Sequence, residues 1–181
     1  MIFVTDPQGA LRYICPEWTS FSGQSREEAY TRGWYAPILS ADRAIVRGVF
    51  SEASATQDEF SVRFRVHHAD GTIRWLSAGG VPSFGPPDHS FLGYLGSMTE
   101  LGSHETSEIT AFGDVGRFLP PPTHPATRPV CRLDSIADHL IIAHALIEQD
   151  ESLPALVEVS AALFKVGQAL ARKWEPRTLH N

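Results

Sequence analysis

The stretch that decides the fold is residues 58–76, which reads DEFSVRFRVHHADGTIRWL. Apolar and polar side chains alternate along its first half with a period of two residues, which is typical of a strand with one buried face. The apolar positions are Phe60, Val62, Phe64 and Val66, and the positions between them are Ser61, Arg63, Arg65 and His67. The segment therefore predicts a strand with one side in a core.

A hairpin turn follows this strand at Asp70-Gly71. An Asp-Gly pair suits a two-residue loop in which both residues have positive φ. Such a loop would place one apolar and one basic face on the hairpin, because it sets the pairs Val66 opposite Trp75, His67 opposite Arg74 and His68 opposite Ile73.

The words Arg-x-Arg and Asp-Gly-x-x-Arg-Trp in this hairpin resemble the PAS/PAC type of PAS domain. Further pieces of the family pattern follow in the right order: Phe3-Val4-Thr5-Asp6, Trp18-Thr19-Ser20-Phe21-Ser22-Gly23, Ser25-Arg26-Glu27-Glu28-Ala29, Ser40-Ala41-Asp42-Arg43 and Gly93-Tyr94-Leu95-Gly96. The resemblance covers roughly residues 2–101. It implies an α+β fold, in which short helices cover one face of a five-stranded antiparallel sheet around a small interior pocket. The family's closing Asp-Ile-Thr is here Ser97-Met98-Thr99, so the carboxylate that often relays signals onward is missing.

Two further segments follow a PAS domain placed at residues 1–101. Residues 102–131 are rich in Ser, Thr, Glu, Gly and Pro, so we expect a linker that is mostly disordered or extended. A short apolar island within it, which includes Phe112, Val115 and Phe118, could alternatively dock on a neighbouring surface. Residues 132–175 carry apolar side chains at helical spacing on both sides of a polar break, which predicts an α-helical hairpin.

The second helix of the hairpin has more apolar surface than one antiparallel helix can cover. It could pack on its own PAS domain, or pair with the same hairpin of a second chain in a four-helix bundle, and we favour the homodimer. The residues expected to make this interaction are Leu156, Leu163, Phe164, Gly167, Leu170 and Trp174.

The resemblance also implies an interior pocket, which family members use for haem, flavin, small metabolites or nothing. His68 would lie on the apolar face in the inferred register, where a lone imidazole needs a partner or a ligand; otherwise it lies half-exposed near the turn with local hydrogen bonds. The residues that could line the pocket are His68, Trp34, Tyr35, Trp75 and Tyr94, although such aromatic residues can also be simple core. Haem is disfavoured because the helix expected at residues 42–53 has no His, and covalent flavin photochemistry because Cys15 lacks the Asn-Cys-Arg-Phe-Leu-Gln context. The remaining possibilities for the pocket are a small metabolite or no cofactor.

Composition narrows the functional classes. A net charge of −6 and a pI near 5.7 give no general attraction for nucleic acid. No apolar run approaches the roughly 20 residues of a membrane helix, and no signal peptide begins the chain, so we expect a cytoplasmic protein. Cys15 and Cys131, the two cysteines, suggest neither a disulfide framework nor a metal site.

Together these observations predict a non-catalytic sensory or protein-interaction module, since no nucleophile, paired-carboxylate or metal motif stands out. It would relay ligand or partner binding through dimerisation or through docking of a separate effector, such as a kinase or regulator. The alternative is a phosphotransfer partner of a histidine-kinase system that uses His139 or His144 in the helical hairpin.

Overall fold

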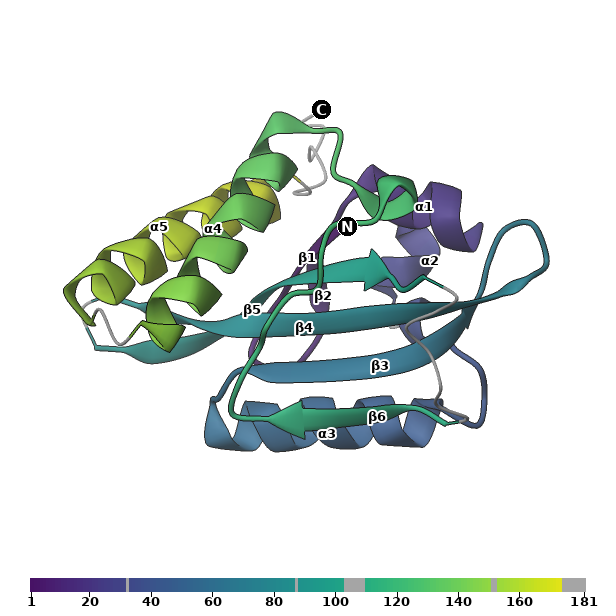
Figure 1. Ribbon diagram of the computed structural model, residues 1–181, viewed down its shortest axis with the longest axis horizontal. Helices are drawn as coiled ribbons and strands as arrows, with labels where there is room; N and C mark the ends of the chain where they lie inside the picture. The colour runs from purple at the N-terminus through teal and green to yellow at the C-terminus, as the bar shows by residue number, and fades with distance from the viewer. Residues whose placement is uncertain (32, 87, 103–109, 151–152, 174–181) are drawn as a thin grey trace, which may run out of the picture.

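The computed structural model describes residues 1–31, 33–86, 88–102, 110–150 and 153–173. Its centre is an antiparallel sheet with the strand order β2-β1-β5-β4-β3-β6 (Figure 1). The strands are β1 (Ile2–Thr5), β2 (Leu11–Ile14), β3 (Phe60–His67), β4 (Ile73–Gly85), β5 (Ser90–Glu100) and β6 (Phe112–Val115). This confirms the expected α+β PAS fold, with one strand more than expected.

Short helices cover the inner face of the sheet. They are α1 (Pro16–Ser22), α2 (Arg26–Tyr30), the 3-10 turn η1 (Gly33–Tyr35) and α3 (Arg43–Thr56). The expected capping box forms at α2, where Ser25 and Glu28 bond each other's backbone N–H. Side chains of these helices, such as Trp18 and Phe50, meet the inward side chains of the strands, including Phe60.

A buried charge pair attaches the start of α3 to the sheet. Asp42 is 1% exposed and accepts hydrogen bonds from the backbone N and the Nε of Arg65 in β3, each at 2.9 Å. Burial alone would raise the pKa of Asp42, but the hydrogen bonds and charge of Arg65 outweigh burial and hold that pKa below its usual value. The Ser40-Ala41-Asp42-Arg43 motif therefore fixes the position of α3 on the sheet.

Two longer helices cover the outer face. These are α4 (Arg132–Gln149) and α5 (Leu153–Arg172), which lie side by side over the sheet (Figure 1). In β5, Tyr94 packs inward against Phe50 and Phe60, so the next residue, Leu95, points to the other face. A Cβ at Gly167 of α5 would lie 3.9 Å from the Cβ of Leu95. The hairpin therefore packs on its own PAS domain, which was one of the two arrangements that the apolar surface allowed.

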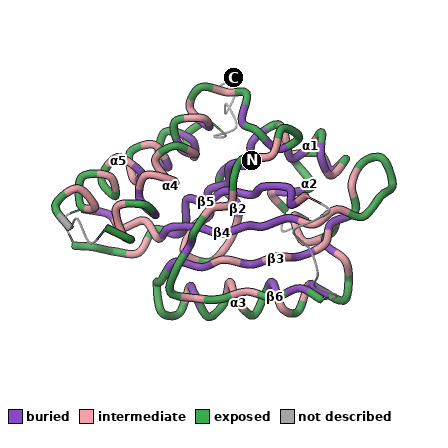
Figure 2. Tube along the Cα trace, viewed as in Figure 1, coloured by how far each residue is buried: buried purple, intermediate pink, exposed green. Residues whose placement is uncertain are grey.

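The burial pattern follows this layering. The central strands are largely buried, whereas the sides of α4 and α5 that face away from the sheet are exposed (Figure 2). In β5, every residue from Gly93 to Glu100 is buried, because helices cover both faces of this strand.

The register expected for the β3–β4 hairpin is wrong by one residue. The observed pairs are Arg65 opposite Trp75, Val66 opposite Arg74 and His67 opposite Ile73. Residues 68–72 form the loop, in which the His68 N–H bonds the Thr72 carbonyl and Gly71 has φ of +85°. Asp70 does not have the positive φ that a two-residue loop of this kind requires, so the chain makes a longer turn. The alternation of β3 itself is confirmed, with Phe60, Val62, Phe64 and Val66 buried.

The described part of residues 102–131 is more ordered than a linker. Its strand β6 pairs with β3, and the 3-10 turn η2 (Pro125–Thr127) bonds β5 through Thr127 Oγ1 and the Glu100 N–H at 3.2 Å. Phe118 is 1% exposed and packs over Gly79 of β4, where a Cβ would lie 2.3 Å from its ring. The apolar island thus docks on the sheet, at a position where only glycine leaves space for the ring.

Phe118→Ala should lower the free energy of unfolding by about 3–4 kcal/mol, because the change leaves a cavity on the outer face. Phe112→Ala is the matched control: its ring is 38% exposed, so we expect a loss of about 1 kcal/mol or less. Urea unfolding of the two variants measures the difference. Equal effects would contradict the docked position of Phe118.

Candidate functional site: the interior cavity and the covered outer face

The interior cavity of the domain is small and apolar. Its volume is about 30 Å³, room for about one water molecule, whereas binding sites for small molecules usually measure about 300–1,000 Å³. The side chains that line it are Phe3, Thr5, Leu11, Ile14, Trp18, Trp34, Val46, Phe50, Phe60, Val62, Phe64, Ala78 and Met98. Aromatic and aliphatic side chains fill most of the interior.

Of the five residues expected in the pocket, Trp34 lines this cavity. Its ring stacks on that of Tyr35, with centroids 3.7 Å apart, and Tyr35 lies outside the lining. Tyr94 is fully buried in an aromatic cluster next to the cavity, and its hydroxyl donates to the Asp58 carbonyl at 2.9 Å.

Trp75 and His68 lie away from the cavity. The Trp75 ring is 5.5 Å from the Arg65 guanidinium. His68 packs edge-on against Phe21, and its Nδ1 lies 3.2 Å from the Asp70 N and 2.9 Å from Asp70 Oδ1. His68 therefore lies half-exposed near the turn and makes local contacts, which was the alternative to a position in the pocket.

The outer face brings together three of the residues that the sequence assigned to an interaction surface. Leu163, Gly167 and Leu170 of α5 are buried within the chain's own structure. Leu156 and Phe164 are partly buried, and both border a groove between α5, the end of α4 and the end of β4. Trp174 lies outside the described residues. These seam residues of α5 therefore pack within one chain, between the hairpin and the sheet.

A buried polar pair fixes the start of α4 to the sheet. The Tyr13 hydroxyl in β2 donates to Asp134, with the two carboxylate oxygens 2.7 and 2.9 Å away, and Asp134 is fully buried. Burial first, and then the hydrogen bond to Asp134, raises the pKa of Tyr13. Burial also raises the pKa of Asp134, with a further contribution from Glu17, although the bond from Tyr13 opposes this shift. Sequence reasoning missed this pair, because 121 residues separate its members and neither belongs to a motif.

The sequence model of the PAS fold family matches residues 12–96. The chain carries a PAS domain. This match and the observed strand order confirm the resemblance read from the motifs. The cavity therefore lies on the inner face of a PAS sheet, and the α4–α5 hairpin covers its outer face.

Two curated proteins resemble this PAS domain in sequence. An uncharacterized protein, y4lL, of Sinorhizobium fredii is 31% identical over 108 residues, which are 60% of this chain and 13% of that protein. The peroxide stress-activated histidine kinase mak1 of Schizosaccharomyces pombe is 26% identical over 117 residues, which are 60% of this chain and 7% of that protein. The chain spans a small part of the length of either relative, so their similarity concerns the PAS region.

A solved structure of a variant of RsLOV resembles the chain beyond the PAS domain. It has a TM-score of 0.51 and 16% identity, and the match covers 96% of this chain and 89% of that chain. At this identity the likeness shows the fold alone. It extends over the helices that follow the PAS domain.

Among the described helices, one stretch could cross a membrane by length and composition alone, namely Pro154–Arg172 of α5. Length and composition are weak grounds for a membrane helix. In the structure this stretch lies against the sheet and α4, with Leu163 and Leu170 buried.

Tyr13→Phe should cost about 2 kcal/mol of stability at pH 7, because it removes a hydrogen bond to a buried carboxylate. The loss should shrink as the pH falls through the pKa of Asp134, which burial raises above the ordinary Asp value, since a protonated Asp134 no longer needs the donor. Tyr30→Phe is the control: the Tyr30 hydroxyl accepts from the neutral Ile14 N–H, so its effect should not follow the protonation of Asp134. Urea unfolding between pH 5 and 8 tests this, and a pH-independent loss in Tyr13→Phe would contradict it.

Proposed function

We propose that this PAS domain is a non-catalytic signalling module. Binding of a ligand or partner would shift the strands of its sheet and so change the position of the α4–α5 hairpin. The protein would act as a homodimer on a separate effector protein such as a kinase or regulator. The observation that carries the proposal is the contact of the hairpin with the outer face of the sheet. Because α5 lies against β1, β2, β4 and β5, a shift of these strands changes the surface on which the hairpin lies.

The packed interior supports a sensing mechanism that uses neither haem nor covalently bound flavin. A cavity of about 30 Å³ leaves room for neither group unless the core rearranges. Cys15 does not line the cavity, and its Sγ accepts a hydrogen bond from the Ile2 N–H at 3.2 Å. Burial raises the pKa of Cys15 to about 12, which keeps it a thiol rather than a reactive thiolate. A small metabolite, or a partner protein without any bound molecule, fits this interior better.

Exposed apolar side chains on the hairpin support the homodimer. Ile136 and Leu146 on α4 are 49% and 57% exposed, and Val157 on α5 is 68% exposed. Since the seam of α5 is already buried on the chain's own sheet, these exposed side chains are available to a second copy. Two hairpins that meet there would form a four-helix bundle, which is a common way to cover such surface. The same proposal places the protein in the cytoplasm, with no part for nucleic acid or a membrane.

Leu146→Glu combined with Val157→Glu should turn the dimer into a monomer at micromolar concentration, because a charge in an apolar interface costs several kcal/mol. Light scattering after size-exclusion chromatography gives the mass. Val130→Glu is the matched control: Val130 is 82% exposed but precedes α4, so this variant should remain a dimer. A monomeric wild type, or a double variant that stays dimeric, would contradict the proposed interface.

The phosphotransfer alternative now depends on one histidine. His144 is 6% exposed, and its Nδ1 lies 3.1 Å from Glu59 Oε1. A phosphate could therefore reach His144 only if this contact were broken. His139 is exposed, and its Nδ1 lies 2.6 Å from the Ser135 carbonyl, which leaves Nε2 free to react. The observation that supports this second function is the sequence similarity to a histidine kinase.

If the chain accepts phosphate, His139→Gln should abolish acid-labile ³²P labelling by a histidine kinase, whereas His144→Gln should retain it. Labelling that persists in His139→Gln would remove this alternative, and so would wild-type protein that takes up no label.

A further inference from the structure

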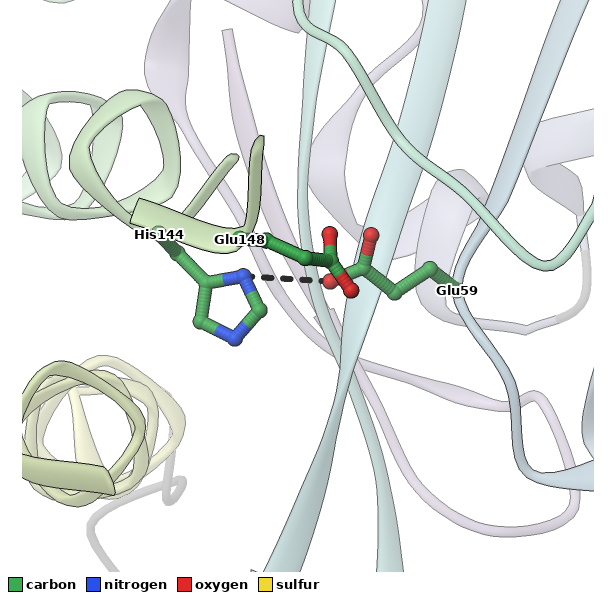
Figure 3. A group of neighbouring side chains, drawn as sticks. All are labelled: Glu59, His144 and Glu148. Carbon is green, nitrogen blue, oxygen red and sulfur yellow. Dashed lines mark ion pairs between the residues drawn. The ribbon is translucent and has the colours of Figure 1, made fainter. Parts of the chain in front are cut away.

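Three ionisable side chains from distant parts of the chain meet between α4 and the start of β3. They are Glu59, which directly precedes β3, and His144 and Glu148 of α4 (Figure 3). One ligand atom from each residue lies within 4.8 Å of the corresponding atoms of the other two. In Figure 3 the Glu148 carboxylate lies beside that of Glu59, and the imidazole of His144 faces both.

These atoms are buried and lack hydrogen bonds. Glu59 and His144 are each 6% exposed. Within the described part of the chain, Glu59 Oε1, His144 Nδ1 and Glu148 Oε2 are buried and make no hydrogen bond of good geometry, although the first two are 3.1 Å apart. Buried polar atoms nearly always have partners, so three that converge on one point indicate a site for something else.

The surrounding backbone orients the cluster. The Phe118 N–H donates to Glu59 Oε2 at 2.9 Å, and the Gly116 N–H donates to the Glu59 carbonyl at 2.7 Å. With Oε2 and the backbone held in this way, Oε1 is left to face His144. His144 and Glu148 are four residues apart on one helix, so both side chains project from the same side of α4.

The charge balance of the cluster favours an added cation. Two carboxylates this close repel each other when both are ionised. A divalent cation between them would remove that repulsion.

We propose that Glu59, His144 and Glu148 form a binding site for a divalent transition-metal ion, with Zn²⁺ the ion that fits best, which clamps α4 onto the sheet. One imidazole nitrogen and two carboxylate oxygens are a ligand set that Zn²⁺ accepts, whereas Mg²⁺ and Ca²⁺ prefer oxygen ligands alone. Zn–ligand bonds of about 2.0–2.1 Å place neighbouring ligands about 3.3 Å apart. The 3.1 Å between Glu59 and His144 is close to this value, and the long side chain of Glu148 needs a small movement to complete it.

The clamp would act at the end of α4 opposite the Tyr13–Asp134 pair. That pair holds the first turn of α4, and the metal would hold its last turns to Glu59 and, through Phe118, to the outer covering of the sheet. Three protein ligands leave a fourth position open, and the cluster borders the groove lined by Leu156 and Ser160 of α5. The proposed signalling function needs no metal, so this inference goes beyond it and can fail on its own.

The test is calorimetric titration of ZnCl₂ into the 181-residue protein after treatment with a chelator. We expect one site per chain with a micromolar or lower Kd, and a melting temperature that rises with Zn²⁺ concentration. Glu148→Gln should weaken binding at least tenfold while the apo protein keeps its circular dichroism spectrum, and His144→Gln should do the same if it folds. Glu158→Gln, an exposed change of the same type on α5, should bind as the wild type does.

Replacement of Zn²⁺ by Co²⁺ gives a second readout, because the visible absorption of Co²⁺ is much stronger when a protein holds it in a tetrahedral site than when it is hydrated. We expect the Co²⁺ spectrum in wild type and Glu158→Gln and its loss in Glu148→Gln, with no competition from millimolar Mg²⁺. Absence of saturable binding by the wild type would overturn the proposal and leave a simple ion pair. Equal affinity in wild type and Glu148→Gln would also overturn it, since the metal would then be bound elsewhere.

Discussion

The outer face of this sheet carries an apolar patch at Val4, Leu95 and Val81, which lie side by side on β1, β5 and β4, and the structure depends on covering this patch. α1, α2 and α3 cover the inner face, as expected for a PAS domain, but Leu95 and its neighbours on the other side would remain in water. The α4–α5 hairpin and the segment around Phe118 bury them. Burial of apolar surface contributes about 25 cal/mol per Å², so this contact holds the hairpin on the sheet without a covalent link.

The proposed signalling function rests on this covering. The interior cavity of the PAS domain has a volume of about 30 Å³, while the outer face of its sheet is in contact with the α4–α5 pair of helices. Polar contacts at both ends of α4, at Tyr13 and Asp134 and at Glu59 and His144, decide how the helix lies on the sheet. Such buried polar contacts add little net stability but are sensitive to protons and ions, which suits a regulatory contact.

Sequence patterns predicted the elements better than their contacts. The alternation in β3 and the helical spacing after residue 132 reflect local periodicity and were correct. The register failed because Asp70 and Gly71 are part of a longer loop, and β6 was missed because its pairing with β3 overrides a composition typical of linkers. The seam at Leu163, Gly167 and Leu170 was visible, but spacing does not say what covers it. The His144-x-x-x-Glu148 spacing was also visible, whereas Glu59, the third residue of the cluster, comes from a distant part of the sequence.

The most direct test of this account is an engineered disulfide between Leu95→Cys and Gly167→Cys, made with Cys15 and Cys131 changed to Ser. A Cβ at residue 167 would lie 3.9 Å from that of residue 95, within the range of about 3.5–4.5 Å that disulfides require. Mass spectrometry and non-reducing electrophoresis after mild oxidation should show a bond within one chain, with a raised melting temperature. Free thiols, or a bond that links two chains, would contradict a hairpin packed on its own sheet.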